Sequence, residues 1–243
     1  MKLVTKTMVS IGCAAAISCV AFGCSSPENA TQEQNEPAIA SIDQKAAPSD
    51  IVVNESGFTT DEHGIVYFAA IVSNPNSNWA AERIEVTAIS KDESGTIIGT
   101  QKQMVKLLFA NGKTAVCGTA KNASAPASVD FQVSVPANAW TQTDVTQADF
   151  EKDIHINGIN EINDGSIMTS FTGEAVNNSK IAYSVPAVNV VLRAEDGSIV
   201  TGYSGFVATE MPSGSVMPFS VDAFNVPAHA SIEAYIDCGY PQQ

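Results

Sequence analysis

The sequence predicts an all-β protein in which two antiparallel β-sandwiches follow one another along the chain. Short runs alternate between apolar and polar side chains, and this period of two is typical of half-buried strands. Turn residues interrupt the runs about every 8–12 residues, and no convincing amphipathic helix is present. The same order of runs and turns occurs twice, roughly one hundred residues apart, a period too long for a solenoid unit.

The first element, residues 1–23, is an expected signal peptide. Lys2 and Lys6 provide a basic start, and an apolar run of 16 residues, 8–23, follows. As a helix this run would be about 24 Å long, which is shorter than the roughly 30 Å hydrocarbon core of a bilayer. We therefore expect a cleaved signal rather than a permanent span.

The signal ends in Ala21-Phe22-Gly23-Cys24, which resembles the lipobox of bacterial lipoproteins. In that family the cysteine becomes the first mature residue and carries the acyl chains, although Leu is usual where Ala21 stands. The resemblance implies lipidation of Cys24 and an exported protein anchored to the cell membrane on its extracytoplasmic side. An ordinary secretory signal with an incidental cysteine is the alternative.

Residues 24–50 form an expected disordered, acidic tether. Ile39 and Ile42 are its only sizeable apolar side chains, so the segment cannot bury enough surface to offset its ordering entropy. Its root-mean-square reach is roughly 28 Å, which would hold the first domain clear of the lipid.

Two domains, 51–140 and 154–243, are expected to follow the tether. In the first we expect strands at 51–58, 64–74, 83–91, 95–105, 113–120 and 128–135. In the second we expect strands at 154–159, 166–177, 186–194, 198–208, 215–222 and 231–237. Asn-Gly and Asp-Gly turns favour tight reversals between strands, so each domain is predicted to be a small sandwich, immunoglobulin-like in the broad sense. The polar connection, 141–153, is expected to form no strand and one short helical turn at 144–152.

The two copies align residue by residue with small gaps. Phe68 lies over Phe171, and Asn74 lies over Asn177. Glu174 falls where the first copy has Ile71, so one strand face is apolar in one copy and acidic in the other. Simple exposure of Glu174 or a specialised surface in the second copy would explain this difference.

The second copy also carries a family resemblance, in residues 188–197. The pattern resembles the FxLYD-domain family of bacterial lipoproteins, in which a Phe-x-Leu-Tyr-Asp strand precedes a glycine turn. Val190 and Leu192 take the Phe and Leu positions, but Arg193 and Ala194 replace Tyr and Asp. The resemblance implies an immunoglobulin-like fold on a lipoprotein, and it implies no catalytic residues.

The chain is acidic, with 26 acidic and 12 basic residues. Residues 141–243 hold 13 of the acidic residues and 3 of the basic ones. This balance opposes binding to nucleic acid or adsorption to anionic lipid, both of which need clustered Lys and Arg. Solubility of a surface protein explains the charge, and recruitment of a basic partner or Ca²⁺ is the alternative.

Cys117 and Cys238 are the two cysteines outside the leader. They do not occupy equivalent positions in the copies, which excludes a bridge within either domain if the repeat is right. We expect two free, partly buried thiols, and a disulfide between the domains is the alternative.

The sequence predicts no catalytic, cofactor-binding or metal-binding residues. His63 lies in an expected solvated turn, His155 on the exposed face of a strand and His229 in a loop, and none has the spacing of a zinc site. Four carboxylates in the connection lack the glycine and the terminal glutamate of an EF-hand, so we expect a solvated linker. They are Asp144, Asp149, Glu151 and Asp153.

Trp79, Trp140 and Glu174 are the candidate interaction surface. The two tryptophans are expected in loops at the two ends of the first domain, where exposed tryptophans often anchor recognition. A cover over the joint between the domains would explain Trp140 equally well.

Together these features predict a lipid-anchored bacterial cell-surface protein with a non-catalytic binding or spacer role. Its expected partners are the membrane, through the lipidated N-terminus, and an envelope protein or ligand that the sequence does not identify. An accessory subunit of an envelope enzyme or transporter is the alternative, and a divalent-metal-binding module is a further one.

Overall fold

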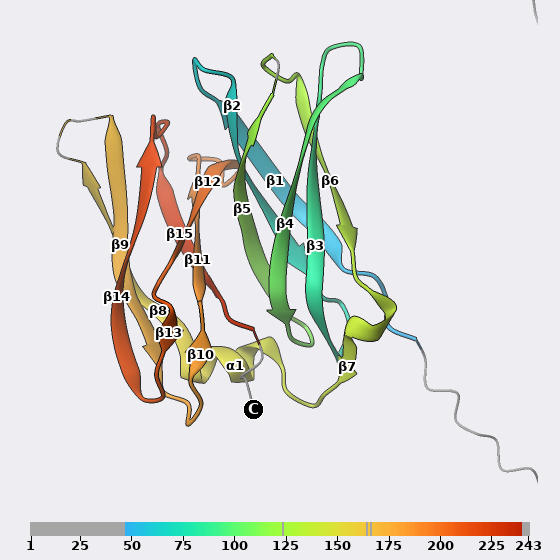
Figure 1. Ribbon diagram of the computed structural model, residues 1–243, viewed down its shortest axis with the longest axis vertical. Helices are drawn as coiled ribbons and strands as arrows, with labels where there is room; N and C mark the ends of the chain where they lie inside the picture. The colour runs from blue at the N-terminus through green and yellow to red at the C-terminus, as the bar shows by residue number, and fades with distance from the viewer. Residues whose placement is uncertain (1–46, 123, 164, 166, 240–243) are drawn as a thin grey trace, which may run out of the picture. The chain divides into compact units, whose positions relative to one another are not determined.

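The computed structural model describes residues 47–122, 124–163, 165 and 167–239. The expected signal peptide, Cys24 and all but the last residues of the expected tether lie outside this part. Within it, the chain is built of antiparallel strands with a single α-helix, so the predicted all-β fold is confirmed (Figure 1).

The first half contains two sheets, with strand orders β1-β2-β5 and β4-β3-β6. Their strands are β1 (Val52–Thr60), β2 (Ile65–Ser73), β3 (Trp79–Lys91), β4 (Ile97–Leu108), β5 (Lys113–Lys121) and β6 (Ser128–Ser134). Each strand begins and ends within a few residues of its expected bounds. Apolar side chains that the period of two places on the facing sides of the sheets pack together, among them Phe68, Ile84 and Leu108.

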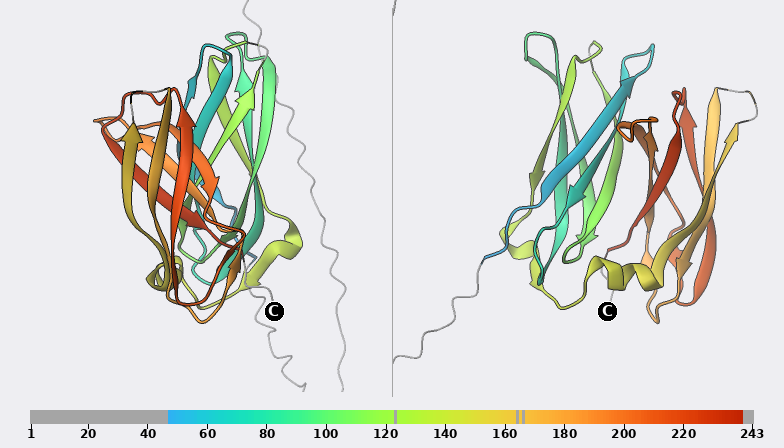
Figure 2. Two further views of the ribbon diagram at one scale, coloured as in Figure 1. Left: turned by 60° about the vertical axis from the view of Figure 1, so that its left-hand side comes forward. Right: turned by 180° about the vertical axis from the view of Figure 1, so that it is seen from behind.

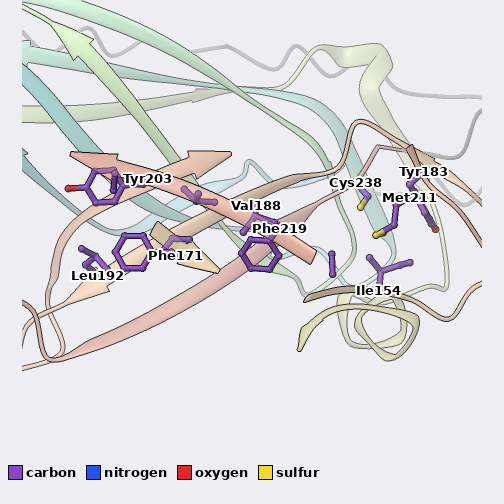
Figure 3. Packing of buried hydrophobic residues seen from close by; sticks show 13 residues of the cluster. Ile154, Phe171, Tyr183, Val188, Leu192, Tyr203, Met211, Phe219 and Cys238 are labelled. Carbon is purple, nitrogen blue, oxygen red and sulfur yellow. The ribbon is translucent and has the colours of Figure 1, made fainter. Parts of the chain in front are cut away.

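The second half repeats this arrangement, with strand orders β8-β9-β14 and β12-β11-β15. Its strands are β8 (Ile154–Asn163), β9 (Met168–Asn177), β11 (Ala187–Arg193), β12 (Ile199–Phe206), β14 (Ser215–Phe224) and β15 (Ser231–Asp237). Two short strands that the sequence did not predict, β10 (Tyr183–Ser184) and β13 (Glu210–Met211), pair with each other. Figure 3 shows the core of this half, where Phe171, the counterpart of Phe68, is fully buried among Val188, Leu192 and Phe219.

An asparagine at the end of the central strand closes each half. Asn74 and Asn177 are both buried, and each donates from Nδ2 to three backbone carbonyls. The acceptors are Trp79, Leu108 and Phe109 (2.7, 3.3 and 3.1 Å) in the first half and Ile181, Met211 and Pro212 (2.7, 3.1 and 2.9 Å) in the second. In each case Oδ1 accepts from the backbone N–H two residues further on. The aligned asparagines therefore make equivalent hydrogen bonds to backbone carbonyls in the two halves.

The connection between the halves differs from its expected form. It contains η1 (Ala137–Ala139), β7 (Trp140–Gln142) and α1 (Gln147–Asp153), and Figure 2 shows α1 where the chain passes from one half to the other. A capping box starts α1, because Thr146 accepts from the Asp149 N–H while the Asp149 carboxylate accepts from the Thr146 N–H. No helix in the described part of the chain is both long and apolar enough to cross a bilayer.

The prediction that the connection forms no strand, with Trp79 and Trp140 in loops at opposite ends of the first half, is wrong. Strand β3 begins four residues earlier than expected, at Trp79, and its added length pairs with β7. Trp140 pairs with Ala81 in this ladder, two positions from Trp79, so both tryptophans lie at the same end of the first half. Both are half-buried, and Trp140 packs on the first-half core rather than over the joint.

Candidate functional site

The two halves pack sheet against sheet and form one compact unit. The face of β1-β2-β5 that points away from the first core meets the face of β12-β11-β15 that points away from the second core. Six buried residues from both halves make an apolar centre for this junction. They are Ala69, Ile71, Ala115 and Cys117 from the first half and Val191 and Ile199 from the second.

Two glycines allow the backbones to approach closely at the junction. A Cβ atom on Gly57 in β1 would lie 2.0 Å from the carbonyl oxygen of Ile199. A Cβ atom on Gly202 in β12 would lie 2.5 Å from Cys117 Sγ and 2.8 Å from Ala69 Cβ. No larger residue fits at either position without a shift of the sheets.

The junction explains why the two copies differ at Ile71 and Glu174. Ile71 is buried because its strand face meets the second half. Glu174 lies on β9, in the sheet that does not form the centre of the junction, where it is exposed and accepts from Asn157 Nδ2 at 3.0 Å. The structure therefore does not bring Glu174 together with Trp79 and Trp140.

An arginine from the second half ties the two halves electrostatically. Arg193 donates through both terminal nitrogens to Glu55 of the first half, at 2.7 Å each, and its Nε lies 2.9 Å from a Glu233 oxygen. The hydrogen bond from Arg193 lowers the pKa of Glu55. Burial raises the pKa of Glu233, but the bonds from Arg193 and Tyr235 outweigh it, so the net shift is downward. The Arg193 side chain is only 13% exposed, which reduces the screening of this pair by solvent.

Side chains of the second half also bind backbone groups of the first. The Asp237 carboxylate accepts from the Lys106 N–H of β4 at 3.1 and 3.2 Å, and Asn189 Oδ1 accepts from the Cys117 N–H of β5 at 3.2 Å. Strands β4 and β5 are sheet edges, so these bonds satisfy donors that no neighbouring strand reaches. Asp237 is almost fully buried, and burial raises its pKa to about 6.

Cys117 and Cys238 are free thiols, as expected, and both are fully buried. Burial raises the pKa of Cys238 to about 12 and raises that of Cys117 as well. Because the thiolate is the reactive form, neither side chain has the properties of a nucleophile.

The three histidines lie apart. His63 is exposed in the β1–β2 turn, where Asp61 Oδ1 accepts from its N–H. His229 covers one end of the second core, with its ring against Phe171 and Nε2 3.2 Å from a Glu161 oxygen. The prediction that His155 lies on an exposed face is wrong, because the residue is half-buried and its Nδ1 atom is fully buried.

In the acidic connection, Asp149 stabilises the helix α1. Asp149 belongs to the capping box of α1 and accepts from Lys152 Nζ at 2.7 Å. The hydrogen bonds from Lys152 and Thr146 lower the pKa of the Asp149 carboxyl. In the part of the chain that the structure describes, no three His, Cys, Asp or Glu residues are grouped so that they could hold a metal ion.

Several hollows lined by residues of both halves surround the junction. One of about 250 Å³ lies beside Asp237 and Lys106, with the exposed side chains of Met104 and Phe206 at its edge. A second, of about 450 Å³, includes Lys113, His155 and Glu233. A third, of about 350 Å³, is lined by residues from five strands of both halves. The sequence could not reveal them, since their walls form only when the two halves meet.

Comparison with known proteins adds no family to these observations. No model of a protein family matches the chain, and no curated protein is similar to it.

Proposed function

We propose that the protein is a lipid-anchored surface protein of a bacterium whose two sandwiches act as one rigid, non-catalytic unit for binding or spacing. The junction is the observation that supports this proposal most directly. It combines an apolar centre, close approach at Gly57 and Gly202, and the ion pairs of Arg193. Two flexibly joined domains would need none of these features.

The polar groups at the junction favour a non-catalytic role. Asp237 and Asn189 bind backbone N–H groups, and Arg193 is held between two carboxylates. A catalytic site would instead need a nucleophile, a base and an orienting group facing one reacting atom. The lipobox-like Ala21-Phe22-Gly23-Cys24 and the FxLYD-like strand support a location at the cell surface.

The reactivity of Cys117 tests whether the halves form one rigid unit. Its thiol lies in the centre of the junction, whereas Cys238 belongs to the second core. We expect N-ethylmaleimide to modify Cys117 only at urea concentrations that also unfold the protein and expose Cys238, as measured by peptide mass spectrometry. In a Thr100→Cys variant the exposed thiol on β4 should react at once, which shows that the reagent is active.

Early modification of Cys117 would contradict the proposal. If Cys117 reacts while Cys238 stays protected and the far-ultraviolet circular dichroism is native, the halves separate before they unfold. They would then be two independent modules, and the spacer role would lose its physical basis.

A further inference from the structure

The third hollow has the size and composition of a small-molecule site. Its volume of about 350 Å³ lies within the range of roughly 300–1,000 Å³ that is common for ligand pockets. It is lined by residues of β2, β4, β5, β12 and β14, among them Tyr67, Gln103, Thr119, Tyr203, Ser204 and Asp222. Since the first half and the second half both contribute, the junction fixes the shape of the hollow.

Tyr203, one of the residues that line this hollow, has a buried hydroxyl group. Tyr203 is 5% exposed, and its ring packs against Phe171 and Tyr67, with centroid distances of 6.0 and 5.4 Å. Its hydroxyl group finds no hydrogen-bond partner in the described part of the chain. An unsatisfied buried hydroxyl costs about 1–3 kcal/mol. The Tyr203 oxygen is closed to solvent in the unliganded chain, so a ligand recovers this free energy when its binding moves the lining enough to reach the hydroxyl.

Further polar groups come from both sides of the junction. Thr119 on β5 and Ser204 on β12 are exposed and belong to the two sheet faces that meet there. Gln103 lies over Gly118, where an added Cβ atom would be 2.5 Å from the Gln103 Nε2 atom. The missing side chain at Gly118 therefore leaves space for the amide of Gln103.

The charges around the hollow favour a neutral ligand. No Lys, Arg or His lines it, which disfavours phosphates and carboxylates. Its one acid, Asp222, accepts through Oδ1 from Ser170 Oγ at 2.7 Å and Ser220 Oγ at 3.2 Å, and its exposed position lets water screen its charge, which weakens its attraction for a cation. The remaining groups are hydroxyls and an amide, with aromatic surface from Tyr67 and from Phe224, which is 46% exposed.

From this geometry we infer that the hollow binds a neutral, hydroxyl-rich ligand of the sugar class, with Tyr203 among the residues that line the site. Sugar hydroxyls donate and accept hydrogen bonds, as do Tyr203, Thr119 and Ser204, and the C–H surface of a sugar ring packs on aromatic side chains. The inference rests on the binding role proposed above and specifies its ligand.

The test is binding of neutral monosaccharides to the full chain. Glucose, galactose, mannose and N-acetylglucosamine serve as probes in saturation-transfer NMR and calorimetry, and glucuronate and glucosamine serve as charged probes. We expect millimolar binding of at least one neutral sugar and weaker binding of both charged ones. Tyr203→Phe should weaken binding by about fivefold to tenfold, the usual effect of one lost hydrogen bond.

Tyr183→Phe is the matched control. Tyr183 is buried in the same core but does not line the hollow, so this variant should bind the sugar like the wild type. Tyr203→Phe should also fold, since it removes a hydroxyl that the fold leaves unsatisfied. The inference fails if no neutral sugar binds, if both variants weaken binding equally, or if a charged probe binds best. Failure with Cys117 still protected from N-ethylmaleimide would reject this site alone and leave the rigid-unit proposal intact.

Discussion

At the scale of single residues, the strongest prediction comes from the side-chain hydrogen bonds of Asn74 and Asn177. Each of these buried side chains donates to three backbone carbonyls at one end of its half. We expect Asn74→Ala and Asn177→Ala each to lower the free energy of unfolding by about 2–4 kcal/mol, measured by urea denaturation.

Neighbouring asparagines provide controls for this prediction. Asn78 and Asn178 are exposed, and Ala at either position should change the free energy of unfolding by less than about 0.5 kcal/mol. If all four substitutions have similar effects, the asparagines do not close the two halves in the way their hydrogen bonds indicate.

Asp237 predicts a distinctive dependence of stability on pH. Burial raises its pKa from 3.8 to about 6, so its contribution to stability is fully present below pH 3.8 and is lost as the pH rises through about 6. Asp237→Asn keeps an oxygen that can accept from the Lys106 N–H but does not ionise. The variant should therefore gain stability relative to the wild type between about pH 4 and pH 6, by at most about 3 kcal/mol. The free energy of unfolding of both proteins is measured by denaturation at each pH. If it changes with pH in the same way in both, the pKa of Asp237 is not raised in the folded protein.

At the scale of elements, the contact of β1 with β12 depends on Gly57. Gly57→Ala places a Cβ atom against the backbone oxygen of Ile199, and a backbone atom cannot swing away as the end of a side chain can. We expect a loss of about 1–3 kcal/mol in the free energy of unfolding. At Gly239 the nearest atoms to an added Cβ are 3.7 Å away, so Gly239→Ala should be nearly neutral in the same urea titration. Equal stability of the two variants would mean that β1 and β12 are farther apart than described.

Most strands could be predicted from the sequence because their burial is local in origin. The period of two in β3 and β9 places apolar residues on one face, and Asn or Gly residues mark the turns. Strands β7, β10 and β13 have two or three residues each, too few for a period to show. They form because longer segments elsewhere in the chain bring a partner to them.

The junction was not predicted, although differences between the two copies are a sequence signal for it. Ile71 is buried there while its counterpart Glu174 is exposed. Residues 84–88 align with 188–192, and Val191 is buried at the junction while its counterpart Thr87 lies on the outer sheet of the first half. Each difference alone is explained by exposure. Their common cause is visible only in the structure, where the first copy contributes the sheet β1-β2-β5 to the junction and the second contributes β12-β11-β15.

At the scale of the whole molecule, this pairing joins non-equivalent faces of the two copies. Such a head-to-tail contact can in principle continue to further copies. The first copy prevents this on its β4-β3-β6 sheet, where Lys102 pairs with Glu85 at 2.8 Å and Lys91 pairs with Asp130. Charged pairs at these positions favour water over a third sandwich on this sheet.

The proposed role at the cell surface requires that the two sandwiches are held at the membrane. The last prediction therefore concerns the anchoring residue, Cys24. Cys24→Ser should move the protein from the membrane fraction to the soluble extracytoplasmic fraction, because the acyl chains supply the anchoring free energy at about 0.8 kcal/mol per buried CH₂. Cys19→Ser is the control and should leave the protein in the membrane fraction, since only Cys24 ends the lipobox-like sequence. Mass spectrometry of the mature N-terminus should find lipid on Cys24 in the wild type and in the control. A wild-type protein whose mature N-terminus carries no lipid would reduce the leader to an ordinary secretory signal and leave the two sandwiches unattached to the membrane through it.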